Sequence, residues 1–118
     1  LLDIESMEQL FSHPVYGASF EGFVLENILT QLPRWQVSFY RTSSGAEFDL
    51  ILEKAGKRVA IEIKASTSPK LGRGNWSALE TLEADCSYVV APVDVTYPLQ
   101  QGVMVMSLDD VIETVKKI

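Results

Sequence analysis

The sequence lacks the patterns that are typical of disulfide-bonded proteins, membrane-spanning proteins and ATP-binding proteins with a phosphate-binding loop. It contains one cysteine, Cys86, so no internal disulfide can form, and we expect a reducing, cytoplasmic setting. No apolar run approaches the ~20 residues that a membrane-spanning helix needs. The phosphate-binding pattern G-x-x-x-x-G-K-[ST] is also absent, so the chain does not bind ATP by that route. The sequence begins without a methionine, and we expect it to be part of a longer protein.

Positive charge is also scarce. The formal net charge is -6, which argues against non-specific binding of nucleic acid by the whole surface. Residues 41–73 nevertheless hold seven of the ten basic residues and four acidic ones, so this window carries +3 and the flanks carry -9. Any contact with nucleic acid is therefore expected within this window, although a cluster of solvated charges would give the same pattern.

The spacing of apolar residues predicts one α/β domain over residues 1–118. Helices are predicted over residues 6–13, 18–32, 76–85 and 107–118, with Ser19 as the N-cap of the second helix and Pro33 closing it. Strands are predicted over residues 35–41, 47–53, 58–65, 86–92 and 103–108. This order predicts a three-layer sandwich with a mixed central sheet, antiparallel in its first strands and crossed over by the helix at Trp76.

Asp49, Glu62 and Lys64 interrupt two segments that otherwise have the character of buried strands. Side chains alternate between the two faces of a strand. Alternation places the following apolar residues on one core-facing surface: Phe48, Leu50, Leu52, Val59, Ile61 and Ile63. With the strands paired as a hairpin, Asp49, Glu62 and Lys64 are then expected to meet on the opposite face.

These residue types suit a metal site. Two carboxylates on neighbouring strands repel one another unless a cation lies between them, and hard oxygen ligands favour Mg²⁺ or Mn²⁺. A lysine beside them can orient a metal-bound water or stabilise charge on a phosphate. Glu21 or Glu26 could add a third acid from the preceding helix. They lie about 140° apart around its axis, and we favour Glu21. The alternative is a solvated strand face that protects a sheet edge.

The order of these residues along the chain resembles the motif of a known protein superfamily. A helical Glu, a strand Asp and Glu-x-Lys in the next strand resemble the PD-(D/E)XK nuclease superfamily, which has the restriction-endonuclease-like fold. A closer similarity covers essentially the whole chain. It is to the C-terminal domain of unknown function in a family of prokaryotic AAA-type ATPases, and it rests on "HPVYGASFEGFVLENIL", "FYRTSSGAEFDLILE", "VAIEIKAS" and "SPKLGRG".

The resemblance implies roles for four residues. Asp49 and Glu62 match the metal-binding acids of the superfamily, Lys64 its catalytic lysine, and Glu21 looks like the helical acid. The implied cofactor is Mg²⁺ or Mn²⁺. The proline of the "PD" motif is replaced by Phe48. An N-terminal ATPase module of the same full-length chain is the implied partner.

The expected function is metal-dependent hydrolysis of DNA phosphodiester bonds. Arg41, Lys70 and Arg73 flank the expected site in loops and are the candidates for contacts with backbone phosphates. The alternative is a non-catalytic module on the same fold that binds nucleic acid or protein and regulates the ATPase, because one fold hosts many functions.

Overall fold

Three helices and six strands make up the described part of the chain, which comprises residues 14–118, with side chains described from residue 18 onward. The structure is a computed structural model. The helix predicted over residues 6–13 lies outside this range. In chain order the elements are α2 (Pro14–Gln31), β1 (Gln36–Arg41), β2 (Glu47–Lys54), β3 (Lys57–Ile63), α3 (Arg73–Leu82), β4 (Cys86–Val90), β5 (Tyr97–Pro98), β6 (Met104–Met106) and α4 (Leu108–Lys116).

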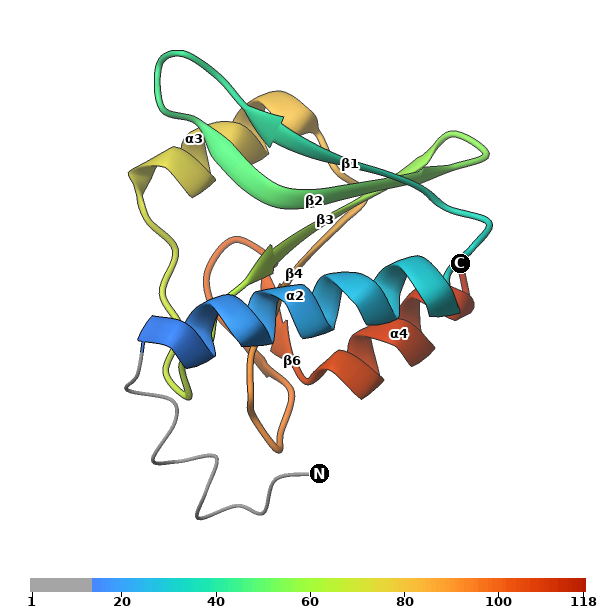
Figure 1. The fold of residues 1–118 in the computed structure, drawn as a ribbon. Helices are drawn as coiled ribbons and strands as arrows, with labels where there is room; N and C mark the ends of the chain where they lie inside the picture. Colours follow the sequence, from blue (N-terminus) through green and yellow to red (C-terminus); the bar gives the residue numbers. More distant parts are fainter. Residues whose placement is uncertain (1–13) are drawn as a thin grey trace.

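The strands form a single mixed sheet in the order β1-β2-β3-β4-β6-β5. The β1–β2 and β2–β3 pairs are antiparallel, whereas β3 pairs with β4, and β4 with β6, in parallel. The parallel β3–β4 connection passes through α3 (Figure 1). The predicted mixed sheet with a helical crossover is therefore confirmed. The short strand β5, which pairs with β6, falls in a segment predicted to be only a connection.

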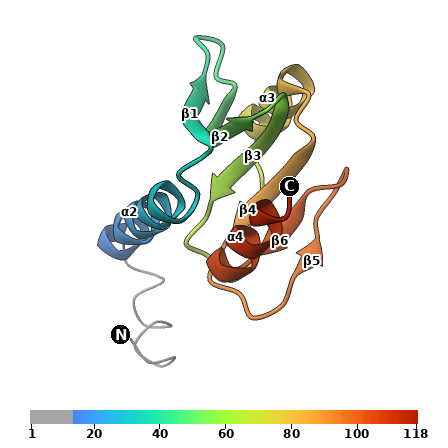
Figure 2. The ribbon, with the colours of Figure 1, turned by 90° about the vertical axis from the view of Figure 1, so that its right-hand side faces the viewer.

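Helices cover both faces of the sheet, which gives three layers. Helices α2 and α4 pack on one face, where a core cluster includes Val24, Ile28, Leu52, Ile61 and Val111. Figures 1 and 2 show α3 on the opposite face. There a second cluster joins Phe48, Ile51 and Ala60 to residues of α3. The predicted α/β sandwich is therefore confirmed. Within residues 14–118, no helix combines the length and hydropathy needed to cross a membrane.

Helices α2 and α3 differ from the prediction in where they begin or end. Helix α2 begins at Pro14, so Ser19 lies inside the helix and is not its N-cap. Proline suits the first position of a helix because its fixed φ is helical and its missing N–H needs no partner there. Helix α3 begins at Arg73 and ends at Leu82, three residues earlier at each end than predicted. Helix α4 begins at Leu108, one residue after the predicted start, and Ser107 is its N-cap, with the Ser107 side chain accepting the N–H of Asp110.

Helix α3 starts in close contact with the loop between β1 and β2. A Cβ atom at Gly74 would overlap the carbonyl oxygen of Gly45 and lie 3.8 Å from Cγ of Glu47. Only glycine permits so close an approach of helix to loop. The first turn of α3 therefore packs closely against the segment that leads into β2.

Substituting this glycine should destabilise the domain. We expect Gly74→Ala to lower the free energy of unfolding by about 1–3 kcal/mol, because the added methyl group forces the helix and loop apart. Gly22→Ala is the matched control, since a Cβ there meets nothing within 4 Å. In α2 that change should stabilise by about 0.5–1 kcal/mol. Urea denaturation measures both; equal effects of the two substitutions would contradict the close contact.

Candidate functional site

Strand β2 changes its pairing register next to Asp49. Ser38 of β1 lies opposite Ile51, but Tyr40 lies opposite Phe48, so one residue of β1 faces two residues of β2. This is the pattern of a β-bulge, which bends the strand and redirects side chains. Asp49 therefore sits where β2 departs from regular pairing.

The bulge changes the faces of the β2 side chains. Leu50 and Leu52 belong to the core under α2 and α4, as predicted. Phe48 does not share their face, because it packs with Ile51 in the cluster against α3. The predicted common face of Phe48, Leu50 and Leu52 is therefore wrong, and the reason is that the extra residue breaks the simple alternation of the strand.

The β2–β3 ladder is continued at this end by side chains. Its terminal backbone pair is Leu50 with Ile61. Beyond that pair, the N–H of Asp49 donates to Oε1 of Glu62 at 2.9 Å. The N–H of Ile63 donates to Oδ2 of Asp49 at 2.8 Å. Each carboxylate therefore accepts a backbone hydrogen bond from the other strand, and these reciprocal bonds hold the two acids side by side.

Glu62 is buried, with 5 % of its surface exposed. Its Oε2 atom accepts a hydrogen bond from Nδ2 of Asn75 at 3.0 Å and lies 3.5 Å from Nζ of Lys64. Burial, followed by the charge of Asp49, raises the pKa of Glu62 from 4.5 to about 7, although the hydrogen bonds and Lys64 act in the opposite direction. Glu62 can therefore gain or lose a proton near neutral pH.

Glu21 belongs to the same electrostatic cluster. It lies on α2 with an exposed side chain. Partial burial, followed by the charge of Asp49, raises its pKa, whereas Lys64 lowers it. Glu26, the other helical candidate, is exposed five positions further along α2, on a different side of that helix. The structure therefore holds Asp49, Glu62 and Lys64 together at one end of the sheet, and Glu21 lies within electrostatic range of Asp49 and Lys64.

The three predicted phosphate-binding residues are all exposed. Nε of Arg41 lies 3.7 Å from Oε2 of Glu47, and both side chains are more than half exposed, so this ion pair contributes little to stability. Lys70 lies in the loop before α3, and Arg73 is the first residue of that helix. Arg73 lies two residues before Asn75, whose side chain donates to Glu62 and to the carbonyl oxygen of Glu47.

The donor set fits a magnesium-type ion only in part. Asp49 and Glu62 offer hard oxygen atoms, but no group of three or more acids, histidines or cysteines in residues 14–118 is placed to hold an ion. Mg²⁺ retains several waters and is commonly bound by one or two carboxylates together with substrate phosphates. A two-carboxylate site formed by Asp49 and Glu62 is compatible with that chemistry.

Asn75 is a site residue that the sequence analysis missed. It is as buried as Glu62, at 5 % exposure. The helix containing it was predicted to begin at Trp76, which left Asn75 in a loop. The signal available in the sequence was a small polar residue next to the start of a helix, a position at which asparagine commonly makes local hydrogen bonds.

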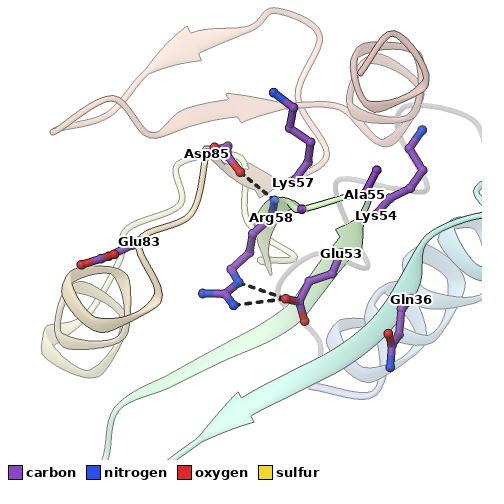
Figure 3. A pocket seen from close by; sticks show the side chains of 9 residues that line it. Gln36, Glu53, Lys54, Ala55, Lys57, Arg58, Glu83 and Asp85 are labelled. Atoms are coloured by element: carbon purple, nitrogen blue, oxygen red, sulfur yellow. Dashed lines mark hydrogen bonds and ion pairs between the residues drawn. The ribbon is translucent and has the colours of Figure 1, made fainter.

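A separate depression of about 560 Å³ lies at the other end of the β2–β3 hairpin. Figure 3 shows its side chains, including those of Glu53, Arg58 and Asp85. The Arg58 guanidinium donates to Glu53, and its backbone N–H donates to Asp85 at 2.7 Å. These charges neutralise one another locally, so the depression has no uncompensated cluster comparable with that around Asp49.

The pH dependence of stability should depend on Asp49. Asp49→Asn removes a charge but keeps an oxygen for the N–H of Ile63, so the pKa of Glu62 should fall below about 7. The stability associated with a raised carboxyl pKa is fully present below its unfolded value of 4.5 and is lost as the pH rises through about 7. The variant should therefore lose less stability over this window than the wild type.

A ¹³C NMR titration of Glu62, with urea denaturation across the same pH range, measures this effect. Asp85→Asn is the matched control, because Asp85 also accepts a backbone N–H but lies at the far end of the hairpin. An unchanged Glu62 pKa in Asp49→Asn would contradict the coupling of the two acids.

Comparison with known proteins identifies a family and no established activity. The chain is 34 % identical over 114 residues to two uncharacterized proteins, Rv2008c of Mycobacterium tuberculosis and Mb2031c of Mycobacterium bovis. The match covers 97 % of this chain and 26 % of each relative, so the chain spans about a quarter of their length. No solved structure matches significantly. Residues 16–111 match the family described as "Domain of unknown function (DUF4143)", and the chain belongs to that family.

Proposed function

We propose that this domain is a metal-dependent nuclease-like module that hydrolyses DNA phosphodiester bonds as part of a longer ATPase chain. The observation that carries the proposal is the buried Glu62, held beside Asp49 and 3.5 Å from the ammonium group of Lys64. Paired acids beside a lysine are suited to phosphoryl chemistry, in which negative charge develops on a phosphate and an attacking water must be oriented. The resemblance to PD-(D/E)XK nucleases points in the same direction.

Each residue has a distinct task in this proposal. Asp49 and Glu62 would hold Mg²⁺ or Mn²⁺, with Glu21 nearby, and the bound ion would polarise the scissile phosphate. Lys64 is 35 % exposed, so its ammonium group can face a substrate phosphate while remaining near Glu62. The pKa of about 7 belongs to Glu62 in the metal-free protein, so metal binding near neutral pH would be coupled to the release of its proton.

A second candidate is a binding module that regulates the ATPase without cleaving DNA. It is favoured by the lack, within residues 14–118, of three acids placed to hold an ion. The net charge of -6 also favours a protein partner for much of the surface. Both candidates assume that the domain works within a longer chain, as its relatives are about four times as long as the matched segment.

Metal binding and cleavage distinguish the two candidates. Glu62→Ala should abolish Mn²⁺ binding and cleavage. Lys64→Ala should lower the cleavage rate by about 100-fold without weakening Mn²⁺ binding, because Lys64 acts on the phosphate and not as a ligand. Calorimetry with Mn²⁺ followed by cleavage assays on single-stranded, duplex and branched DNA measures these effects. Lys57→Ala, at the far hairpin turn, is the control; wild-type binding without cleavage would favour the regulatory module.

DNA binding should depend on Lys70 and Arg73. Removing one phosphate contact lowers the slope of log affinity against log salt by about one unit, so Lys70→Ala with Arg73→Ala should flatten the slope by about two. The matched control is Lys116→Ala with Lys117→Ala at the end of α4, which removes the same charge from another surface. Titrations of labelled DNA at several salt concentrations, made in the full-length chain, measure both. Equal slopes in the two double variants would remove Lys70 and Arg73 from the binding surface.

A further inference from the structure

Asn75 uses both ends of its side-chain amide in the first turn of α3. Nδ2 donates to the carbonyl oxygen of Glu47 and to Oε2 of Glu62, each at 3.0 Å. Oδ1 accepts the N–H of Gly72, also at 3.0 Å. These partners fix the orientation of the amide. A flipped side chain would place Oδ1 against the oxygens of Glu47 and Glu62, and Nδ2 against the N–H of Gly72.

These bonds connect three segments that are distant in sequence. Glu47 begins β2, Glu62 lies near the end of β3, and Gly72 precedes α3. Because Asn75 is buried, its contact with Glu62 is shielded from water and constrains the side chain more than a surface bond would. The carboxylate of Glu62 is thus held between the Asp49 N–H on Oε1 and the Asn75 amide on Oε2.

Asn75 and Lys64 also share one acceptor atom. Nδ2 of Asn75 lies 3.0 Å from Oε2 of Glu62, and Nζ of Lys64 lies 3.5 Å from the same oxygen. Both donors therefore act on the same oxygen atom, and an amide that fixes the Glu62 carboxylate also fixes the atom that the Lys64 ammonium group faces.

We propose that Asn75 is the positioning residue of this site, which fixes the carboxylate of Glu62 and with it the oxygen that the Lys64 ammonium group faces. The importance of this position for catalysis rests on the proposed nuclease function. The positioning itself is a property of the metal-free protein and can be tested there. Asn75 does not touch the reacting atoms in this proposal, because it acts through Glu62 and Lys64.

Two substitutions separate positioning from helix capping. Asn75→Asp keeps an oxygen for the N–H of Gly72, but it replaces the donor to Glu62 and Glu47 with a second oxygen. Asn75→Ala removes all three bonds. Asn27→Asp is the matched control, because it makes the same change on α2, where Asn27 donates to the carbonyl oxygen of Phe23.

Amide hydrogen exchange in the metal-free protein, at a pH that ionises the acids, provides the first readout. Asn75→Asp should leave the Gly72 amide protected and should make the Asp49 amide, which bonds Glu62, exchange about tenfold faster. Asn75→Ala should expose both amides, and Asn27→Asp neither. An Asp49 amide that stays protected in Asn75→Asp would overturn the proposal and leave Asn75 as a helix cap alone.

Cleavage kinetics with Mn²⁺ and DNA provide the second readout. Asn75→Asp should lower kcat by about tenfold or more while leaving KM for DNA close to the wild-type value, because the loop that carries Lys70 stays bonded to α3 through the N–H of Gly72. A rise in KM with unchanged kcat would count against positioning. If the wild-type protein does not cleave DNA, the nuclease proposal fails, and the exchange of the Asp49 amide still decides the role of Asn75.

Discussion

The reciprocal hydrogen bonds between Asp49 and the Glu62–Ile63 segment determine the shape of this end of the molecule. They form where the backbone ladder between β2 and β3 stops, and each joins a backbone N–H of one strand to a carboxylate of the other. Hydrogen bonds to charged groups are stronger than those between neutral ones, so the two strands stay together where regular pairing has ended. The same bonds place two carboxylates side by side. Repulsion between the two carboxylates and the burial of Glu62 destabilise this arrangement, and both raise the pKa of Glu62, to about 7.

The position of α3 follows from this arrangement. A buried carboxylate requires partners for both oxygens, and Asn75 supplies one of them from the first turn of the helix. Gly74 allows that turn to approach the β1–β2 loop closely enough for Asn75 to reach Glu62 and Glu47. The helix that crosses over between the two parallel strands is therefore anchored at its beginning by polar contacts to the site. Its later residues, such as Ala78 and Leu82, pack in the apolar cluster with Phe48.

Sequence periodicity predicted the architecture well, because burial imposes a period of about two on strands and 3.6 on helices. The mixed sheet, its antiparallel start and the crossover helix are all observed. The errors have local causes. The helix predicted over residues 18–32 begins at Pro14, and the bulge beside Asp49 reversed the expected face of Phe48. A bulge depends on how two strands pair, so alternation along a single strand does not reveal it. Asp49, Glu62 and Lys64 were recognisable as polar residues in apolar strands. The role of Asn75 depends on contacts with residues 13 and 28 positions away, which no local pattern encodes.

The two ends of the β2–β3 hairpin show how one pair of strands combines stability with a polar site. At the turn, Ala55 and Gly56 both adopt positive φ, as tight hairpin turns favour, and Lys54, the last residue of β2, pairs with Lys57, the first residue of β3. Nearby charges there are matched, with Arg58 bonded to Glu53 (Figure 3). At the opposite end, side-chain bonds replace the backbone pairing and the negative charges of Asp49 and Glu62 are only partly offset by Lys64. The regular end specifies the register of the hairpin, and that register brings the two acids together. The apolar packing of Leu50, Leu52, Val59 and Ile61 on one sheet face then compensates for an unfavourable concentration of charge at the other end.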